Sequence, residues 1–202
     1  LCGDIVDDDP RMPEERALAT VEALAEVWPV YYVTGNHEFW TGRVEEVREL
    51  LRARGAVVLE GESAAVTAAG QTLRIGGIDD PNVGEEAWRE QLEAVTAAQD
   101  GEAFSILLTH RPERVEDYAG RGFDLVLAGH AHGGQWRLPG LINGLIAPNQ
   151  GLFPRYAGGR YALDGDTTMI VSRGLAREST RIPRLFNRPE LVVVDILPEG
   201  TA

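Results

Sequence analysis

Lysine is absent from this chain of 202 residues, and all 19 basic residues are arginine. The 32 acidic residues give a formal charge of -13 at pH 7. Such an acidic surface argues against unspecific binding to nucleic acid, which needs positive charge to displace the counterions of the phosphates. We therefore expect no nucleic-acid partner. A substrate that carries phosphate would be attracted by metal ions rather than by the surface as a whole.

Cysteine and long apolar runs are equally scarce. Cys2 is the only cysteine, so the chain has no internal disulfide and no zinc site built from several thiolates. No apolar run reaches the roughly 20 residues that are needed to cross a bilayer. We expect a soluble polypeptide that is located in the cytoplasm or peripherally at a membrane.

The length and the 44% hydrophobic content suit one domain with a sizeable core, and we expect a single domain over residues 1–202. Residues 1–4 resemble the end of a strand. We therefore expect this domain to lack an N-terminal strand and helix. Any segment that associates with a membrane would lie in that missing part.

Hydrophobic spacing predicts helices that alternate with short strands. The expected elements are helices at 13–28, 44–51 and around 88–95, a turn or short helix at 115–122, and strands at 30–33, within 56–78, and at 105–108, 123–127, 161–163, 168–172 and 191–197. This order predicts a layered α/β architecture with helices over a central sheet. The later part, which contains strands only, predicts a mixed sheet or two packed sheets.

Four polar motifs follow the expected strands, and together they contain all four histidines. The motifs are Gly3-Asp4, Gly35-Asn36-His37-Glu38, Thr109-His110 and Gly129-His130-Ala131-His132-Gly133-Gly134. One histidine after a strand is ordinarily a loop residue or a cap. An ordinary domain, however, has no reason to place every histidine at a strand end, where ligands collect in such folds.

Imidazole and carboxylate groups together suit zinc, manganese or iron. His130 and His132 are two residues apart, so an extended backbone turns both side chains to one side at a separation of about 6.5 Å. That span can serve two neighbouring ions, which lie about 3.5–4 Å apart in dinuclear sites. The histidine motifs therefore predict a metal site.

These motifs resemble those of the calcineurin-like metallophosphoesterases. Residues 129–135 (GHAHGGQ), 171–175 (VSRGL) and 184–190 (RLFNRPE) are similar to the YkuE/YaeI-like branch of bacterial phosphodiesterases. The resemblance spans nearly the whole chain. It implies a layered metallophosphoesterase fold, in which mixed β-sheets are flanked by helices.

The resemblance also implies a role for each motif residue. The implied ligands of two divalent ions are Asp4 as the bridge, Asn36, His110 and His130 on one ion, and His132 on the other. His37 would stand near the scissile phosphate, as general acid or charge stabiliser, without binding metal. The implied mechanism is in-line attack on phosphorus by a metal-bridging hydroxide.

One motif of the family has no counterpart in these residues. An Asp-x-His should precede Gly3-Asp4, and the aspartates at 7–9 have no adjacent histidine that could replace it. The ion at His132 would then have only two ligands from this chain. We expect that ion to bind weakly.

Three other polar positions have competing interpretations. Asp79-Asp80-Pro81 is more typical of a turn than of an extra pair of metal ligands. Glu38 is expected to bond backbone groups or to orient a metal ligand. Arg111 could bind substrate phosphate or form a surface ion pair, and the residues favour neither.

An apolar loop follows the last histidine motif. Its large residues are Leu138, Leu141, Ile142, Leu145, Ile146, Leu152 and Phe153. A subsidiary core is the favoured interpretation. The alternative is an apolar wall that would contact a lipid-like or aromatic ester.

The leading hypothesis is a metal-dependent phosphodiesterase or pyrophosphatase. The resemblance implies lipid-linked or nucleotide-sugar substrates, such as UDP-diacylglucosamine. The alternative is a protein-binding module on a degenerate phosphoesterase fold. The four retained histidines argue against that module, and the absent first motif is its one support.

Overall fold

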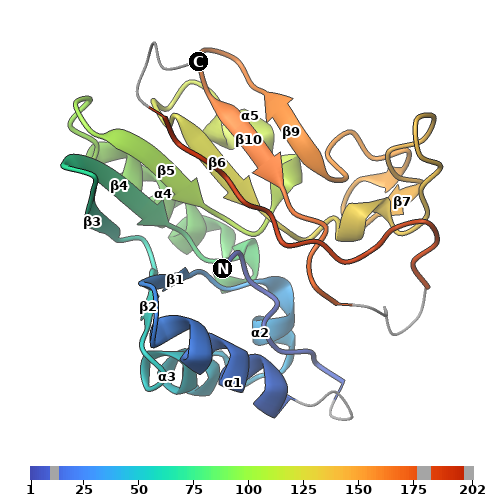
Figure 1. Ribbon diagram of the computed structural model, residues 1–202, viewed down its shortest axis with the longest axis horizontal. Coiled ribbons are helices and arrows are strands. Elements are labelled where there is room, and N and C mark those ends of the chain that lie inside the picture. Colours follow the sequence, from blue (N-terminus) through green and yellow to red (C-terminus); the bar gives the residue numbers. More distant parts are fainter. Residues whose placement is uncertain (10–13, 177–182, 198–202) are drawn as a thin grey trace.

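A six-stranded mixed sheet forms the centre of the fold in a computed structural model, which describes residues 1–9, 14–176 and 183–197 (Figure 1). The strands lie in the order β3 (Ser63–Ala68), β4 (Gln71–Gly77), β5 (Phe104–Leu108), β6 (Leu125–Ala128), β10 (Thr168–Val171) and β9 (Gly159–Ala162). The four inner strands run parallel, and the two edge strands are antiparallel to them. The predicted mixed sheet is confirmed.

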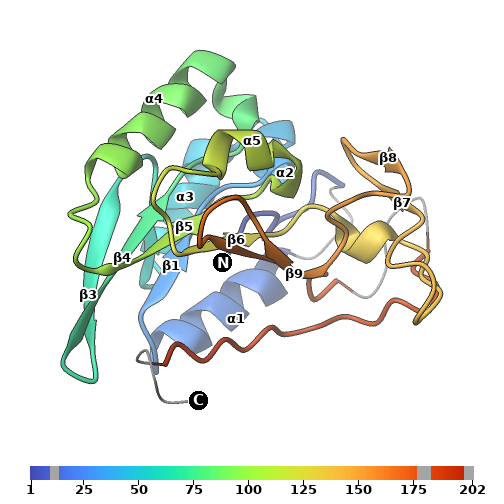
Figure 2. The same cartoon turned by 90° about the horizontal axis from the view of Figure 1, so that it is seen from above.

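Helices α4 (Glu85–Ala97) and α5 (Val115–Tyr118) cover one face of this sheet (Figure 2). The helical stripe of Trp88, Leu92 and Val95 is fully buried, as its spacing predicts. It packs with Leu107 and Val126, whose side chains point to the same face of the sheet. The core on this side of the sheet therefore holds α4 in place.

The other face of the sheet packs against an α/β unit. Its parallel strands β1 (Val30–Tyr32) and β2 (Ala56–Val58) pack on α1 (Glu14–Ala25) and α3 (Val44–Arg52). Val33, just beyond β1, joins Ile106, Leu108 and Leu125 in a core between this unit and the large sheet. The fold is thus layered, with helices outside and strands inside.

Two expected elements differ in the structure. The helix predicted at 13–28 corresponds to α1, which ends at Ala25, so that Trp28 is exposed; its predicted first residue, 13, lies outside the described residues. The strand predicted at 191–197 is wrong, because this apolar segment pairs with no strand in the part of the chain that the structure describes. Among the described residues, no helix is long and apolar enough to span a membrane.

Three strands bring polar loops to one edge of the structure. β5 leads into His110, β6 leads into His130, and β1 leads through Thr34 into the short helix α2 (Asn36–Trp40). Cys2 forms a parallel bridge with Val33, which places Asp4 beside α2. Because parallel strands end at the same edge, residues far apart in the chain meet there.

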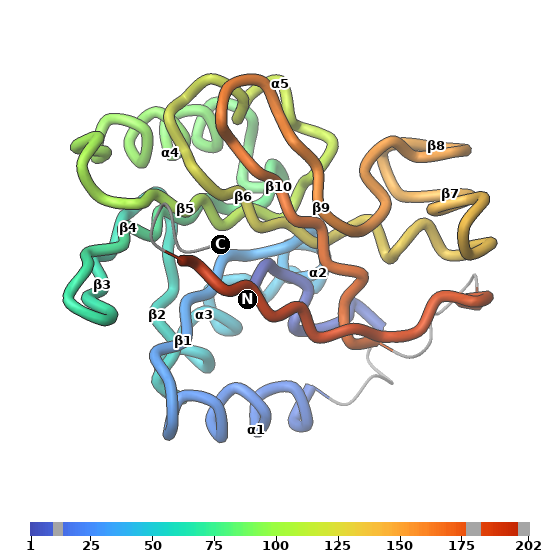
Figure 3. Tube along the Cα trace, turned by 45° about the horizontal axis from the view of Figure 1, so that its top comes forward, coloured from blue at the N-terminus to red at the C-terminus, as the bar shows by residue number. Residues whose placement is uncertain are grey.

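Short elements complete this edge. They are the 3₁₀ turns η1 (Pro81–Val83), η2 (Pro112–Arg114) and η3 (His132–Gly134), and the hairpin of β7 (Ile146–Ala147) and β8 (Gly151–Leu152). The tube in Figure 3 shows this hairpin to one side of the six-stranded sheet. Strand β7 contacts η3, so the apolar loop is adjacent to the last histidine motif.

Candidate metal centre

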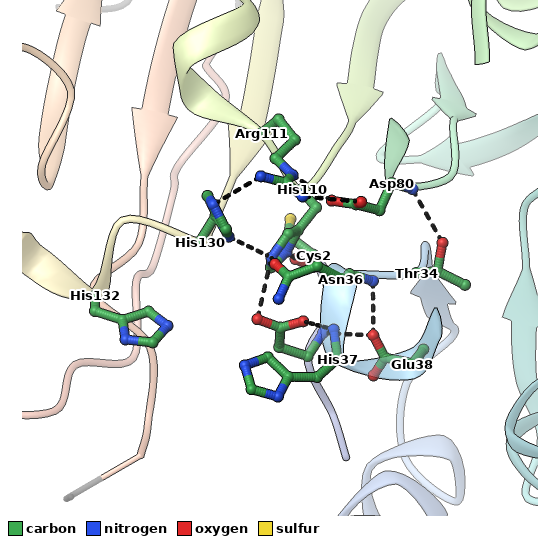
Figure 4. A network of polar contacts seen from close by, with 12 residues as sticks. Cys2, Thr34, Asn36, His37, Glu38, Asp80, His110, Arg111, His130 and His132 are labelled. Carbon is green, nitrogen blue, oxygen red and sulfur yellow. Dashed lines mark hydrogen bonds and ion pairs between the residues drawn. The ribbon is translucent and has the colours of Figure 1, made fainter. Parts of the chain in front are cut away.

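Four predicted ligands meet at the ends of these strands (Figure 4). His110 Nε2 lies 3.1 Å from Asp4 Oδ2 and 3.1 Å from Asn36 Oδ1. It lies 3.0 Å from His130 Nδ1. The ligand atoms of Asp4, His110 and His130 all lie within 4.8 Å of one another. The fold therefore gathers one carboxylate, one amide oxygen and two imidazoles around a single point.

The chemistry of these atoms fits a cation. His110 Nδ1 donates a hydrogen bond to the carbonyl oxygen of Cys2 at 2.6 Å, so that in the neutral ring Nε2 carries a lone pair. That lone pair faces the Asp4 carboxylate and the Asn36 carbonyl oxygen, which are also acceptors. Acceptors that face one another repel unless a proton or a cation lies between them. These nitrogen and oxygen donors suit zinc, manganese or iron.

Local charges prepare the ligands for metal. Burial alone would raise the pKa of Asp4, but His110 and His37 hold it well below its usual range. Burial lowers the pKa of His130 to about 3, helped by the positive charges of His110 and Arg111. The carboxylate is thus charged and His130 is neutral at pH 7, as metal binding requires. Burial would lower the pKa of His110, but Asp4 raises it, so a metal ion at Nε2 would displace a proton from this ring.

Two glycines allow the Asp4 loop to approach α2. A Cβ atom on Gly35 would lie 2.2 Å from Asp4 Oδ1, and one on Gly3 would lie 2.4 Å from the backbone nitrogen of Gly35. Gly3 also has a positive φ of 79°. The glycines in these two motifs are therefore required by the close contact of the two loops.

Glu38 holds the same loop by hydrogen bonds to its backbone. Its side chain is fully buried, and Oε2 accepts hydrogen bonds from the backbone N–H groups of Asp4 and Gly35 at 2.9 and 2.7 Å. Oε1 accepts from the N–H of Ile5 at 2.7 Å. Burial and the charge of Asp4 raise the pKa of Glu38. The expectation that Glu38 bonds the backbone is confirmed.

Left-handed backbone conformations concentrate at this site. Of the eight non-glycine residues with positive φ in the described ranges, five belong to the site or touch it: Asp4, His130, His132, Gln135 and Asn149. Each such conformation costs of order 1 kcal/mol and persists only where the surrounding structure enforces it. This concentration marks the strand ends as a functional region.

His132 and His37 lie outside the group of Asp4, His110 and His130. The His132 ring lies apart from the other labelled histidines in Figure 4, and Gln135 Nε2 lies 3.2 Å from its Nδ1. Burial lowers the pKa of His132 to about 4, so it is neutral at pH 7. His37 forms a separate group with two carboxylates, Asp7 and Asp8. The predicted roles of both histidines stay predictions.

Arg111 forms a buried ion pair. Its side chain is 8% exposed, and Nε and Nη2 bind the two carboxylate oxygens of Asp80, which is fully buried. Arg111 therefore forms an ion pair, as one of the two interpretations expected. The expectation that this pair lies at the surface is wrong, because both side chains are buried. The predicted contact between Arg111 and substrate phosphate stays a prediction.

The Asp-Asp-Pro segment forms the predicted turn. Asp80 begins η1 by accepting a hydrogen bond from the N–H of Asn82 at 2.9 Å. Asp79 binds Arg48 Nη2 at 2.7 Å and accepts from Thr34 Oγ1 at 2.6 Å. Arginines therefore engage both buried carboxylates.

Asn149 is a site residue that the sequence analysis missed. Its Oδ1 lies 2.8 Å from His130 Nε2 and 2.6 Å from Arg111 Nη1. It occurs 17 residues after His132 in the numbering, outside every strand-end motif. The only sequence signal was a polar Asn-Gln pair within an otherwise apolar loop.

The apolar loop does not form the expected subsidiary core throughout. Leu138, Leu141, Leu152 and Phe153 are 46%, 78%, 67% and 66% exposed. The expectation is wrong for these four, because the short β7–β8 hairpin and its flanking turns extend outward from the large sheet, as Figure 3 shows. Large apolar side chains therefore lie in solvent beside the histidine loop.

Comparisons with known proteins agree with this site. The model of the calcineurin-like phosphoesterase family matches residues 1–134. An uncharacterized metallophosphoesterase of Aquifex aeolicus is 31% identical, over 98% of this chain and 72% of that protein. The phosphodiesterase YaeI of Escherichia coli is 27% identical, over 98% of this chain and 69% of that protein. The metallophosphoesterase YkuE of Bacillus subtilis is 29% identical, over 95% of this chain and 64% of that protein.

For two other curated relatives, the chain spans only 58% and 49% of the relative's length. The family model nevertheless covers every candidate ligand of the cluster, from Asp4 to His130. The chain therefore belongs to the calcineurin-like phosphoesterase family, and it is similar to the YkuE/YaeI-like members of that family.

Proposed function

We propose that this chain is the catalytic part of a phosphodiesterase or pyrophosphatase that uses two divalent ions. The observation that carries the proposal is the convergence of Asp4, Asn36, His110 and His130 on one point. His132 and the Asp4 carboxylate would hold the second ion. When bound, ions at this site would polarise the phosphoryl oxygens and lower the pKa of water.

His37 is proposed as the general acid for the leaving oxygen. Its backbone N–H donates to Asp4 Oδ1 at 3.0 Å, which places the histidine directly beside the ligand cluster. Its ring lies 5.0 Å from that of Trp40. A protonated His37 would transfer its proton to the leaving oxygen as the phosphorus–oxygen bond breaks.

We further propose a lipid-linked phosphoester as substrate. Leu141, Leu152 and Phe153 expose apolar surface next to the histidine loop, where they could contact an acyl chain. Charge in this part of the chain is reversed. Residues 134–190 hold eight of the 19 arginines but only four of the 32 acidic residues. This combination suits an anionic headgroup with an apolar tail.

An arginine cluster supports a substrate with additional negative charge, such as a nucleotide sugar. Nη1 of Arg137 and both Nε and Nη1 of Arg184 are buried without a hydrogen-bond partner among the described residues. Burial and the nearby charge of Arg173 lower the pKa of both guanidinium groups. Glu190 is the carboxylate that pairs with Arg173. A second phosphate would satisfy the remaining donors.

Hydrolysis of bis(p-nitrophenyl) phosphate tests the proposed activity. We expect turnover of this ester to require added manganese or zinc, and we expect turnover of an alkyl phosphodiester, whose leaving group needs a proton, to fall by about 10²–10⁴ in His37→Ala. The protein should be assayed with whatever residues naturally flank this chain. Absence of any metal-stimulated turnover would instead support the protein-binding module.

A pair of exposed leucines tests the lipid substrate. The double substitution Leu141→Asp/Leu152→Asp should lower turnover of a lipid phosphodiester in mixed micelles at least tenfold and leave bis(p-nitrophenyl) phosphate hydrolysis unchanged. Trp28→Asp, at an exposed apolar residue beyond α1, is the control. Equal turnover of the lipid by all three proteins would exclude the apolar wall.

A further inference from the structure

We propose that Asn149 is a positioning residue for His130, which it holds in the tautomer that binds metal. The inference rests on the proposed function only in that the ligand of the cluster is a metal ion. Asn149 lies beyond the segment that the family model matches, which ends at residue 134.

The two ring nitrogens of His130 have different partners. Nδ1 lies 3.0 Å from His110 Nε2 and therefore faces the ligand cluster. Nε2, on the other side of the ring, lies 2.8 Å from Asn149 Oδ1. A neutral imidazole carries one proton, so the partner of Nε2 decides whether Nδ1 presents a lone pair to the cluster.

Arg111 would by itself favour the other tautomer of His130. Its Nη1 lies 2.9 Å from His130 Nε2 and 2.6 Å from Asn149 Oδ1. A guanidinium group only donates, so without Asn149 it would favour an unprotonated Nε2. The proton would then move to Nδ1 and point into the cluster, where it would block metal binding.

Asn149 offers Arg111 Nη1 a nearer acceptor, because its Oδ1 lies at 2.6 Å and His130 Nε2 lies at 2.9 Å. Once Nη1 donates to this oxygen, Nε2 no longer has to accept and can carry the proton. The Oδ1 atom of Asn149 can accept hydrogen bonds both from Arg111 Nη1 and from a protonated His130 Nε2. The opposite orientation of the amide would direct its NH₂ group at the donors of Arg111, so the oxygen must face this side. Asp80 binds the other edge of the guanidinium group and holds Arg111 in place. The contacts therefore run from Asp80 through Arg111 and Asn149 to His130.

The neighbouring ligand is oriented by the same chemistry. His110 Nδ1 donates to the carbonyl oxygen of Cys2 at 2.6 Å, which leaves Nε2 free to face the cluster. In both rings, an amide oxygen accepts the proton of the nitrogen that points away from the cluster. Asn149 makes this contact from a left-handed conformation with φ of 57°, which asparagine adopts more readily than most residues.

Metal affinity and tautomer state together test the proposal. Asn149→Gly removes the acceptor and tolerates positive φ, whereas Asn149→Asp keeps an oxygen at the same place. We expect Asn149→Gly to weaken binding of manganese or zinc by 10–100-fold, as measured by calorimetry, and Asn149→Asp to keep it within about threefold. Asn143→Ala is the matched control, because Asn143 lies in the same loop but bonds Gly158 and Tyr161.

Nitrogen-15 NMR of the metal-free protein supplies the second measurement. The chain has only four histidines, so single His→Gln variants assign every ring. We expect His130 to carry its proton on Nε2 in the wild type and to lose this preference in Asn149→Gly. A proton on Nδ1 in the wild type would overturn the proposal, whatever the stability of the variants.

The two proposals fail in distinguishable ways. If Asn149→Gly binds metal as tightly as the wild type and keeps the Nε2 proton, the positioning role is wrong even where catalysis is confirmed. If the wild type binds metal and shows the expected tautomer but hydrolyses no phosphodiester, the positioning role stands and the proposed activity fails.

Discussion

Asp8 Oδ1 lies 2.7 Å from Nδ1 of His37, across 29 residues of sequence. Asp7 lies farther from the same nitrogen, at 3.9 Å. A carboxylate at Nδ1 favours the proton there and leaves Nε2 as the nitrogen that can reach a substrate. The aspartates after Gly3-Asp4, which have no histidine beside them in sequence, therefore meet one in space.

Substitutions in the His37–Asp8 pair should affect the hydrolysis rates of esters differently, according to the leaving group. His37→Gln should slow hydrolysis of an alkyl phosphodiester by at least 10² but slow that of a p-nitrophenyl ester much less, because p-nitrophenolate leaves without a proton. Asp8→Asn should also slow the alkyl ester more than the p-nitrophenyl ester, but by a smaller factor of about tenfold. An equal loss for both esters would show that His37 acts as a charge stabiliser.

The hydrogen bonds of Glu38 to the backbone of the Asp4 loop should contribute to the free energy of unfolding. Glu38→Gln directs an NH₂ group at backbone donors that the carboxylate now accepts from. Loss of two hydrogen bonds to a charged group should lower the free energy of unfolding by about 3 kcal/mol. Glu22→Gln on the exposed face of α1 should change it by less than about 0.5 kcal/mol. Urea unfolding of the metal-free proteins measures both.

The lowered pKa of His132 should make the free energy of unfolding depend on pH. Its pKa of about 4 lies below the ordinary value of 6.5, so the unfolded chain binds a proton in this window that the folded chain does not. The stabilisation is fully present above pH 6.5 and is lost as the pH falls toward 4. Wild type should therefore lose roughly 2 kcal/mol relative to His132→Gln between pH 7 and pH 4, after allowance for partial exposure.

Urea titrations in the presence of a chelator would measure that difference. His37→Gln serves as a comparison at another histidine beside the cluster. A constant difference between wild type and His132→Gln across this range would show that His132 is not buried in its neutral form.

Substitutions of Arg48 and Asp79, which form a buried ion pair, should have strongly non-additive effects on the free energy of unfolding. Their side chains are 5% and 1% exposed, and Asp79 also accepts a hydrogen bond from Thr34, which precedes the Asn36 loop. Arg48→Met alone should cost about 3–5 kcal/mol, because the Asp79 carboxylate stays buried without its charged partner. Asp79→Leu alone should cost less, because Arg48 also pairs with Glu45 and Glu60. The double variant should recover a large part of this loss. Additive losses in the cycle would show that the pair is not coupled.

The sequence by itself indicated the candidate ligands and the class of fold. Strand ends are visible in a sequence because a short apolar run must stop where polar residues begin, and parallel strands deliver their loops to one edge. His110 and His130 follow such runs directly. Their convergence with Asp4 and Asn36 therefore required only the correct alternation of strands and helices.

Only the tertiary structure decided what surrounds those ligands. Asn149 lies in a loop without a periodic pattern, so its contact with His130 depends on the path by which that loop returns. The burial of Arg111 likewise depends on where η1 places Asp80. The apolar pattern at 191–197 suited a strand, but a strand also needs a neighbour with free backbone groups, and local sequence does not encode that neighbour.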